Sequence, residues 1–242
     1  MQTAMLAKSL SGDLAGNGPV LRRPPRRARL VCPPATLISE CRIVTWNARE
    51  LFPVEKKRQA VKSAAFEALA VTADIILIQE THGGTRDLAV RHPQIFSLFE
   101  SGASVCNSAA TGGVLTLVRK SWCPAGTTVC SAATADGRII RTEIYNNTHS
   151  MKVWNVHNQD IRPDELKRTL LRMKADLALV ARTPLTSALV IAGDWNFAAE
   201  GDRSFSIVNG ETSFTSADTP HKRQHATAWN DVLTCCTDIH AT

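Results

Sequence analysis

One pattern occurs twice in the sequence: an apolar segment of strand length, a segment of helix length, and a second apolar strand. The four strands are predicted at 42–46, 74–79, 151–156 and 188–192. Asn47 and Glu80 follow the two strands of the first unit, and His157 and Asp194 follow those of the second. Strands joined through a helix run parallel, so both polar ends of a unit lie at one edge of a sheet, where ligands of α/β proteins bind. The pattern predicts one polar cleft served by four strand ends.

The segment between the strands of each unit has helical periodicity. The first helix, from about Val54 to Ala70, is predicted to bury Val54, Val61, Ala65, Ala68 and Leu69. The second starts at Pro163 with acidic residues in its first turn, ends near Thr183, and is predicted to bury Leu166, Leu170, Met173, Leu177 and Val180.

Further strands are predicted between the two units, at Gln94–Phe99, Gly113–Val118 and Ile139–Ile144, with turns at Gly112-Gly113 and Ala135-Asp136-Gly137. Hairpins inside two strand–helix–strand halves indicate two β-sheets packed face to face with helices outside, an α/β four-layer sandwich.

The positive charge is concentrated at the start of the chain. The formal net charge is +6, and residues 1–42 alone carry seven Lys or Arg against Asp13 and Glu40. Arg-Arg-Pro-Pro-Arg-Arg at 22–27 belongs to a stretch that cannot bury a core. We therefore expect a disordered basic tail over 1–41 and one folded domain over 42–242, whose ligand the overall basicity does not reveal.

The seven cysteines are odd in number and form no Cys-x-x-Cys pair, which argues against a zinc site or a disulfide framework. No apolar run reaches the roughly 20 residues of a membrane helix. These features predict an intracellular protein without a membrane partner.

Four motifs in order carry a resemblance to a known family: Thr45-Trp46-Asn47, Ile78-Gln79-Glu80-Thr81, Asn155-Val156-His157 and Gly193-Asp194-Trp195-Asn196-Phe197. They resemble the endonuclease/exonuclease/phosphatase superfamily with the DNase I-like fold. Within it, they are most similar to the apurinic-type endonucleases encoded by non-LTR (LINE-type) retrotransposons. Gly112-Gly113-Val114 and Asp136-Gly137-Arg138 also match short motifs of those proteins, and the resemblance spans about 42–240.

Phosphodiester hydrolysis needs charge neutralisation at the phosphate and an activated water, and these residues could supply both. Glu80 would bind Mg²⁺ or Mn²⁺, with Asn47 completing the metal pocket. Asp194 would orient or deprotonate the water, and Asn196, on the same side of an extended strand, would donate to Asp194 or the phosphate. His157 matches a superfamily position that holds tyrosine or histidine, and would contact the phosphate or act as an acid. A solvent-exposed strand-end role for Glu80 and a loop role for His157 remain alternatives.

The sequence departs from this family in two places. Glu50 stands where glycine commonly follows the first motif, and no Ser-Asp-His triplet occurs, although that triplet ends these enzymes. The resemblance therefore implies a fold that lacks its final strands, is truncated at the carboxyl end and is impaired in activity.

The leading hypothesis is a metal-dependent endonuclease that nicks DNA, nuclear if it is a retroelement enzyme. A phosphatase or lipid phosphodiesterase of the same superfamily and a non-catalytic nucleic-acid-binding module remain open, because fold alone does not determine the substrate. Oligomeric state is not indicated.

Overall fold

The computed structural model describes side chains at residues 41–106, 111–183, 187–196, 227–229 and 232. It also describes the backbone of strands at 4–9, 27–31, 40, 204–208, 211–215 and 237–238.

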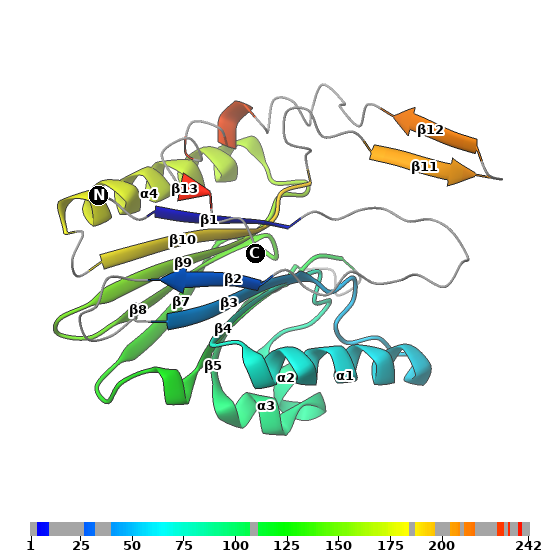
Figure 1. The fold of residues 1–242 in the computed structure, drawn as a ribbon, viewed down its shortest axis with the longest axis horizontal. Coiled ribbons are helices and arrows are strands. Elements are labelled where there is room, and N and C mark those ends of the chain that lie inside the picture. Colours follow the sequence, from blue (N-terminus) through cyan, green and yellow to red (C-terminus); the bar gives the residue numbers. More distant parts are fainter. Residues whose placement is uncertain are drawn as a thin grey trace.

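Two mixed β-sheets lie face to face in the described part of the chain (Figure 1). The first, called here the β3–β4 sheet, has the order β2 (Arg27–Val31), β3 (Glu40–Asn47), β4 (Ile75–Gln79), β6 (Val114–Arg119) and β5 (Phe99–Ser104). The second, the β9–β10 sheet, has the order β13 (Thr237–Asp238), β1 (Ala4–Ser9), β10 (Ser187–Asp194), β9 (Ser150–His157), β8 (Ile139–Tyr145) and β7 (Thr128–Ala135). A separate hairpin pairs β11 (Ser204–Val208) with β12 (Glu211–Thr215).

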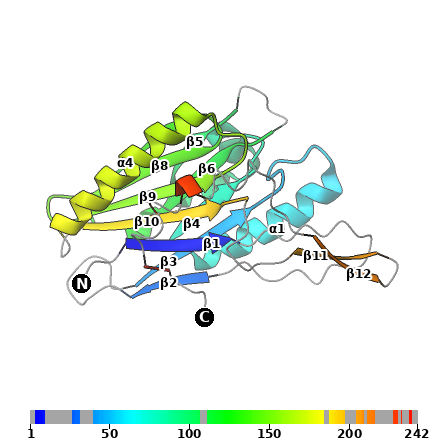
Figure 2. The ribbon, with the colours of Figure 1, turned by 90° about the horizontal axis from the view of Figure 1, so that it is seen from above.

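Helices cover the outer face of each sheet, which gives four layers (Figures 1 and 2). The β3–β4 sheet carries α1 (Lys56–Thr72), α2 (Thr85–Arg91) and α3 (Pro93–Leu98), and the β9–β10 sheet carries α4 (Pro163–Arg182). Each interface between layers is apolar, with Phe66 under α1, Met173 under α4, and Leu77 and Val153 between the two sheets. The predicted α/β four-layer sandwich is confirmed.

Each strand–helix–strand unit forms one parallel strand pair. In the first unit β3 pairs with β4, and in the second β9 pairs with β10. The predicted strands at 42–46, 74–79, 113–118, 139–144, 151–156 and 188–192 all form, within one or two residues of the expected limits. The carboxyl ends of the two parallel pairs reach the same end of the sandwich.

Two local predictions are wrong, for one strand and for the buried face of one helix. Gln94–Phe99 is not a strand: α3 covers Pro93–Leu98, and β5 starts at Phe99. Proline at the first position sets the backbone angle for a helix, and Ile95 alone packs its short turn inward. The extended pairing that the apolar residues suggested begins only where β5 meets β6.

The buried face of α1 also differs from the predicted one. Phe66, Leu69 and Ala70 are buried, whereas Val61 is 46% exposed and Val54 precedes the helix. A large aromatic ring at one position determines which face turns inward, because Phe66 buries far more apolar area than a valine or an alanine. In addition, β7 was not foreseen, because it is a mostly exposed edge strand of Ser, Ala and Thr without apolar alternation.

Two segments of the stretch expected to be disordered form strands. β1 pairs in parallel with β10, and β2 pairs antiparallel with β3. The expected disorder therefore does not describe these two segments, and the remainder of 1–39 lies outside the described residues.

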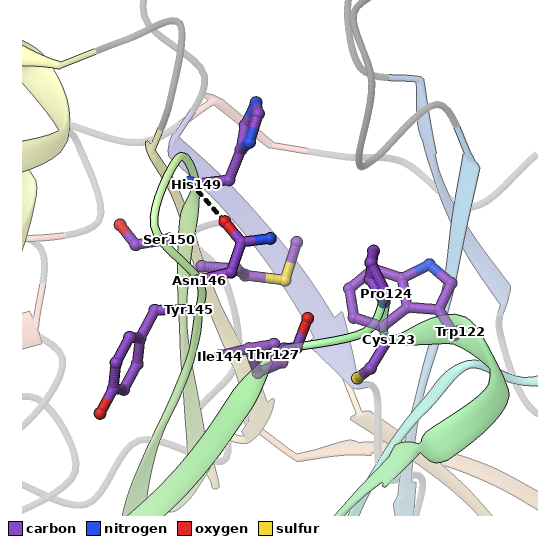
Figure 3. A pocket seen from close by; sticks show the side chains of 10 residues that line it. Trp122, Cys123, Pro124, Thr127, Ile144, Tyr145, Asn146, His149 and Ser150 are labelled. Carbon is purple, nitrogen blue, oxygen red and sulfur yellow. Dashed lines mark hydrogen bonds between the residues drawn. The ribbon is translucent and has the colours of Figure 1, made fainter.

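A small hollow lies at the opposite end of the sandwich from the four polar strand ends. It is lined by the Trp122–Thr127 loop and by the β8–β9 hairpin around Asn146 and His149 (Figure 3). Burial there raises the pKa of the Cys123 thiol, with a further contribution from Glu100. None of the helices in the described ranges has the length and apolar character that a membrane span requires.

Candidate active site

The four strand ends bring their polar side chains together. Ligand atoms of Glu80, His157 and Asp194 all lie within 4.8 Å of one another. Asn47, the last residue of β3, joins them through its side chain. Each sheet contributes two of these residues, so the site spans the interface between the two sheets.

Asn47 bridges the two carboxylates. Its Nδ2 donates to Glu80 Oε1 at 2.9 Å and to Asp194 Oδ2 at 2.6 Å. Its Oδ1 accepts the backbone N–H of Arg49 at 3.0 Å. The amide therefore offsets repulsion between two acids that would otherwise face each other directly.

Glu80 is held as an ionised carboxylate. Contact with His157 lowers its pKa to about 2; burial opposes the shift, and the hydrogen bond from Asn47 and the charge of Arg49 support it. Its backbone φ is +53°, a left-handed conformation that residues other than glycine seldom adopt. The side chain is thus ionised at neutral pH and held at a bend of the chain.

Asp194 is 1% exposed and is fixed by its own turn. Its Oδ1 accepts the backbone N–H of Asn196 at 3.1 Å, while its carbonyl oxygen accepts from the backbone of Asn158 at 2.8 Å. The Asn158 side chain donates to the carbonyl of Trp195 at 2.7 Å and accepts from Trp229 Nε1 at 3.1 Å. The loop after β10 is therefore anchored at both sides of the carboxylate.

His157 is 1% exposed and points two nitrogens in different directions. Nδ1 lies 3.2 Å from Arg138 Nη1, and Nε2 lies 3.4 Å from Glu80 Oε1. Nε2 is buried and makes no well-aligned hydrogen bond among the described residues. Nδ1 of the imidazole is thus anchored by Arg138, and Nε2 is directed into the site.

Backbone strain is concentrated around these residues. Six described non-glycine residues have positive φ, and five of them flank the site: Arg49, Glu50, Glu80, His82 and Asn196. Each such backbone conformation costs of order 1–3 kcal/mol of stability, and strained residues of this kind cluster at functional sites.

Buried amides support the site from inside the sandwich. Gln79 Nε2 donates to Asn155 Oδ1 at 2.7 Å, and Asn155 Nδ2 donates to the carbonyls of Ile78 at 3.2 Å and Leu115 at 3.0 Å. Both amide side chains are fully buried. They join β4 of one sheet to β9 of the other, immediately behind Glu80 and His157.

The site residues suit a hard divalent cation. The two carboxylates offer the oxygen donors that Mg²⁺ and Mn²⁺ prefer, and the Asn47 amino group donates to both of them. Asn196 Nδ2 is buried without a hydrogen-bond partner among the described residues, which leaves a donor available for a phosphate oxygen. The donor set therefore fits a metal ion together with an anionic substrate.

All five residues singled out from the sequence gather here: Asn47, Glu80, His157, Asp194 and Asn196. Their individual roles remain predictions. Sequence reasoning missed the contacts that Arg138, Asn155 and Asn158 make around them. Arg138 and Asn155 lie inside motifs that were noticed, whereas Asn158 offered no signal beyond its position next to His157.

Comparison with known proteins decides the family. The model of the endonuclease/exonuclease/phosphatase family matches residues 44–237, most of the chain. The chain belongs to this family. Membership supports metal-dependent phosphodiester hydrolysis as the class of chemistry. No curated protein sequence matches the chain.

Similar solved structures include one, the first named here, that shows the same fold. The AP endonuclease LMAP from Leishmania major is 16% identical, with a TM-score of 0.56 over 87% of this chain and 67% of that one. The catalytic domain of APE2 from Xenopus laevis is 18% identical, with a TM-score of 0.42, covering 77% of this chain and 67% of its own. A truncated TDP2 from Caenorhabditis elegans is 19% identical, with a TM-score of 0.44, covering 65% and 63%. The chain thus spans about two thirds of each of these proteins.

Proposed function

We propose that the chain is a divalent-metal-dependent phosphodiesterase that acts on DNA as an endonuclease. The observation that carries the proposal is the pair Glu80 and Asp194, brought together from different sheets with the Asn47 amide between them. Two ionisable acids held this close at strand ends, with Glu80 in a left-handed backbone conformation, are typical of a functional site.

Glu80 would hold Mg²⁺ or Mn²⁺, with Asn47 next to it. A bound ion would neutralise charge on the phosphate and on the leaving oxygen. The low pKa of Glu80 keeps it charged over the whole physiological range. In this structure the amino group of Asn47 faces the two acids, and its oxygen faces the Arg49 backbone. A half-turn of the amide group would exchange the oxygen and the nitrogen without changing the volume of the side chain, and the oxygen would then face the acids.

Asp194 would orient the attacking water and accept its proton. Its Oδ1 is engaged by the Asn196 backbone and its Oδ2 by Asn47, so the carboxylate cannot rotate freely. Asn196 would donate from its unpaired Nδ2 to a phosphate oxygen, and His157 would face the same oxygen through Nε2. General acid–base assistance of this kind contributes ~10²–10⁴-fold.

DNA as the substrate and a retroelement-type endonuclease as the subclass are supported by the four sequence motifs in register. A nuclear location would follow from that subclass. The AP endonuclease and TDP2 likenesses concern the fold, so the choice of DNA over another phosphodiester rests on the motifs and on the experiment below.

Nicking of supercoiled plasmid tests the proposal. We expect relaxed circles to appear with Mg²⁺ or Mn²⁺ and to disappear with chelator. Glu80→Gln, which removes a charge with little change in volume, should lower the rate at least ~100-fold. Glu100→Gln is the matched control, because Glu100 is exposed and pairs with Lys120 at the far end of β5.

Undiminished nicking by a folded Glu80→Gln protein would contradict the metal role. A parallel assay with an aryl phosphate monoester separates the alternatives: rapid turnover of the monoester, with no nicking of DNA, would indicate a phosphatase instead.

A further inference from the structure

Arg138 lies beside the site and makes one contact that the roles above do not use. Its Nη1 is 3.2 Å from His157 Nδ1. The side chain is half-buried, and no carboxylate among the described residues forms an ion pair with it. A cation placed against an imidazole nitrogen, instead of against an acid, calls for an explanation.

The two glycine-containing motifs hold Arg138 in place. Gly113 N–H donates to the carbonyl of Gly137 at 2.9 Å, and His157 N–H donates to the carbonyl of Arg138 at 2.7 Å. A Cβ added at Gly112 would stand 2.9 Å from Arg138 Nη1. The absence of a side chain at Gly112 therefore leaves the space that the guanidinium occupies.

Hydrogen-bond chemistry determines what this contact means. A guanidinium has five N–H donors and no acceptor, and it stays protonated in proteins. The nitrogen that faces it must therefore accept, so His157 Nδ1 carries no hydrogen. The neutral ring then has its hydrogen on Nε2, the nitrogen buried 3.4 Å from Glu80 Oε1.

We propose that Arg138 is a positioning residue that fixes His157 as the Nε2–H tautomer, which makes His157 a hydrogen-bond donor into the site and prevents it from binding a metal ion. The role toward a phosphate oxygen rests on the function proposed above. The tautomer itself is a property of the metal-free protein.

The opposite arrangement would look different. A histidine that ligates a metal through Nε2 needs a lone pair there and donates its Nδ1–H to a carbonyl or carboxylate. Here a cation takes the place of that acceptor. The metal pocket is consequently limited to the oxygen donors of Glu80 and Asn47, a set suited to Mg²⁺ or Mn²⁺ and poor for Zn²⁺.

Nitrogen NMR of the histidine rings tests the tautomer directly, in metal-free protein labelled with ¹⁵N-histidine. The His157→Gln spectrum identifies the His157 signals. We expect an unprotonated Nδ1 and a protonated Nε2 in the wild type, the same pattern in Arg138→Lys, and loss of this single-tautomer pattern in Arg138→Met. Lysine keeps the charged donor, whereas methionine keeps only the apolar stem.

Activity provides the second readout. Nicking should fall about 10-fold or more in Arg138→Met and recover most of that loss in Arg138→Lys, since a hydrogen bond to a charged group is being removed and replaced. A purely structural role would lose activity without a change of tautomer.

A wild-type spectrum with Nδ1 protonated would overturn the proposal, as would an unchanged tautomer in a folded Arg138→Met protein. If Arg138→Met fails to fold, the wild-type and Arg138→Lys spectra still decide. Correct tautomers in a protein that never nicks DNA would refute the proposed function and leave the tautomer assignment standing.

Discussion

Gly193, directly before Asp194, should tolerate no side chain at all. Its φ is +151°, and a Cβ built there would lie 1.8 Å from the carbonyl oxygen of Val156 on the paired strand β9. Real Cβ atoms are essentially never found within 3.0 Å of such an atom. Gly193→Ala must therefore push β10 away from β9 by more than an ångström, at the point where both strands enter the site.

The expected cost can be worked out from this geometry. Strain at a glycine-only φ contributes ~1–3 kcal/mol, overpacking adds ~1–3 kcal/mol, and weakened ladder hydrogen bonds add about 1 kcal/mol. The total is about 3–7 kcal/mol, a large part of the ~5–15 kcal/mol that stabilises a typical domain. Gly126→Ala is the matched control: its φ is +82°, but nothing lies within 4 Å of the added Cβ. We expect only about 1–2 kcal/mol there.

Urea unfolding distinguishes the two variants. With a slope of about 2 kcal/mol per molar urea, Gly193→Ala should lower the midpoint by ~1.5–3.5 M and Gly126→Ala by ~0.5–1 M. Midpoints that agree within about 0.2 M would show that the strands separate at no cost, and the close-approach reasoning would then be wrong.

Two further predictions concern charge. Because its folded-state pKa is depressed from 4.5 to about 2, Glu80 should stabilise the metal-free protein above about pH 4.5 and lose that contribution as the pH falls through 2. The shift corresponds to at most about 3 kcal/mol, which partial exposure of Glu80 reduces to ~1 kcal/mol. The difference in unfolding free energy between wild type and Glu80→Gln should therefore shrink on acidification. A difference that stays constant with pH would argue against the pKa shift. On α4, Asp176 accepts from Arg141 at 2.8 and 3.0 Å and pairs with Lys152 at 3.3 Å; burial raises its pKa, and these cations lower it by more. Asp176→Asn should therefore destabilise the fold by ~3–5 kcal/mol in thermal or urea unfolding. The control is Asp164→Asn on the same helix, where Asp164 is exposed and pairs with Arg168, and we expect a loss of only ~0–1 kcal/mol. Equal losses in the two variants would contradict the argument from the buried ion pair.

The arrangement of the strands was predictable because it depends on residues whose effect is local. Apolar runs that end in a polar residue, at Asn47, Glu80, His157 and Asp194, specify strands, and parallel pairing then brings their ends together. Nothing about the partner sheet is needed for that step.

Other features depend on contacts that no local pattern contains. The inward face of α1 is determined by Phe66 packing against Trp46 and His92, with ring centroids 6.5 and 5.1 Å apart. The contact between Arg138 and His157 depends on a turn meeting a strand end, and its residues are 19 positions apart in the sequence. Helical periodicity alone could therefore place α1 in the chain without predicting its rotation.

The buried amides of Gln79 and Asn155 have a consequence for how the two sheets are positioned against each other. Two apolar sheet faces alone would resist sliding only weakly, because dispersion contacts lack direction. A pair of interior amides is different: displacing one sheet by a single residue would leave several polar groups in a dry interior without partners, each at ~1–3 kcal/mol. The two amides thus fix the position of one sheet relative to the other. Because the site residues are divided between the two sheets, this fixed position also determines how closely the carboxylates of Glu80 and Asp194 approach each other.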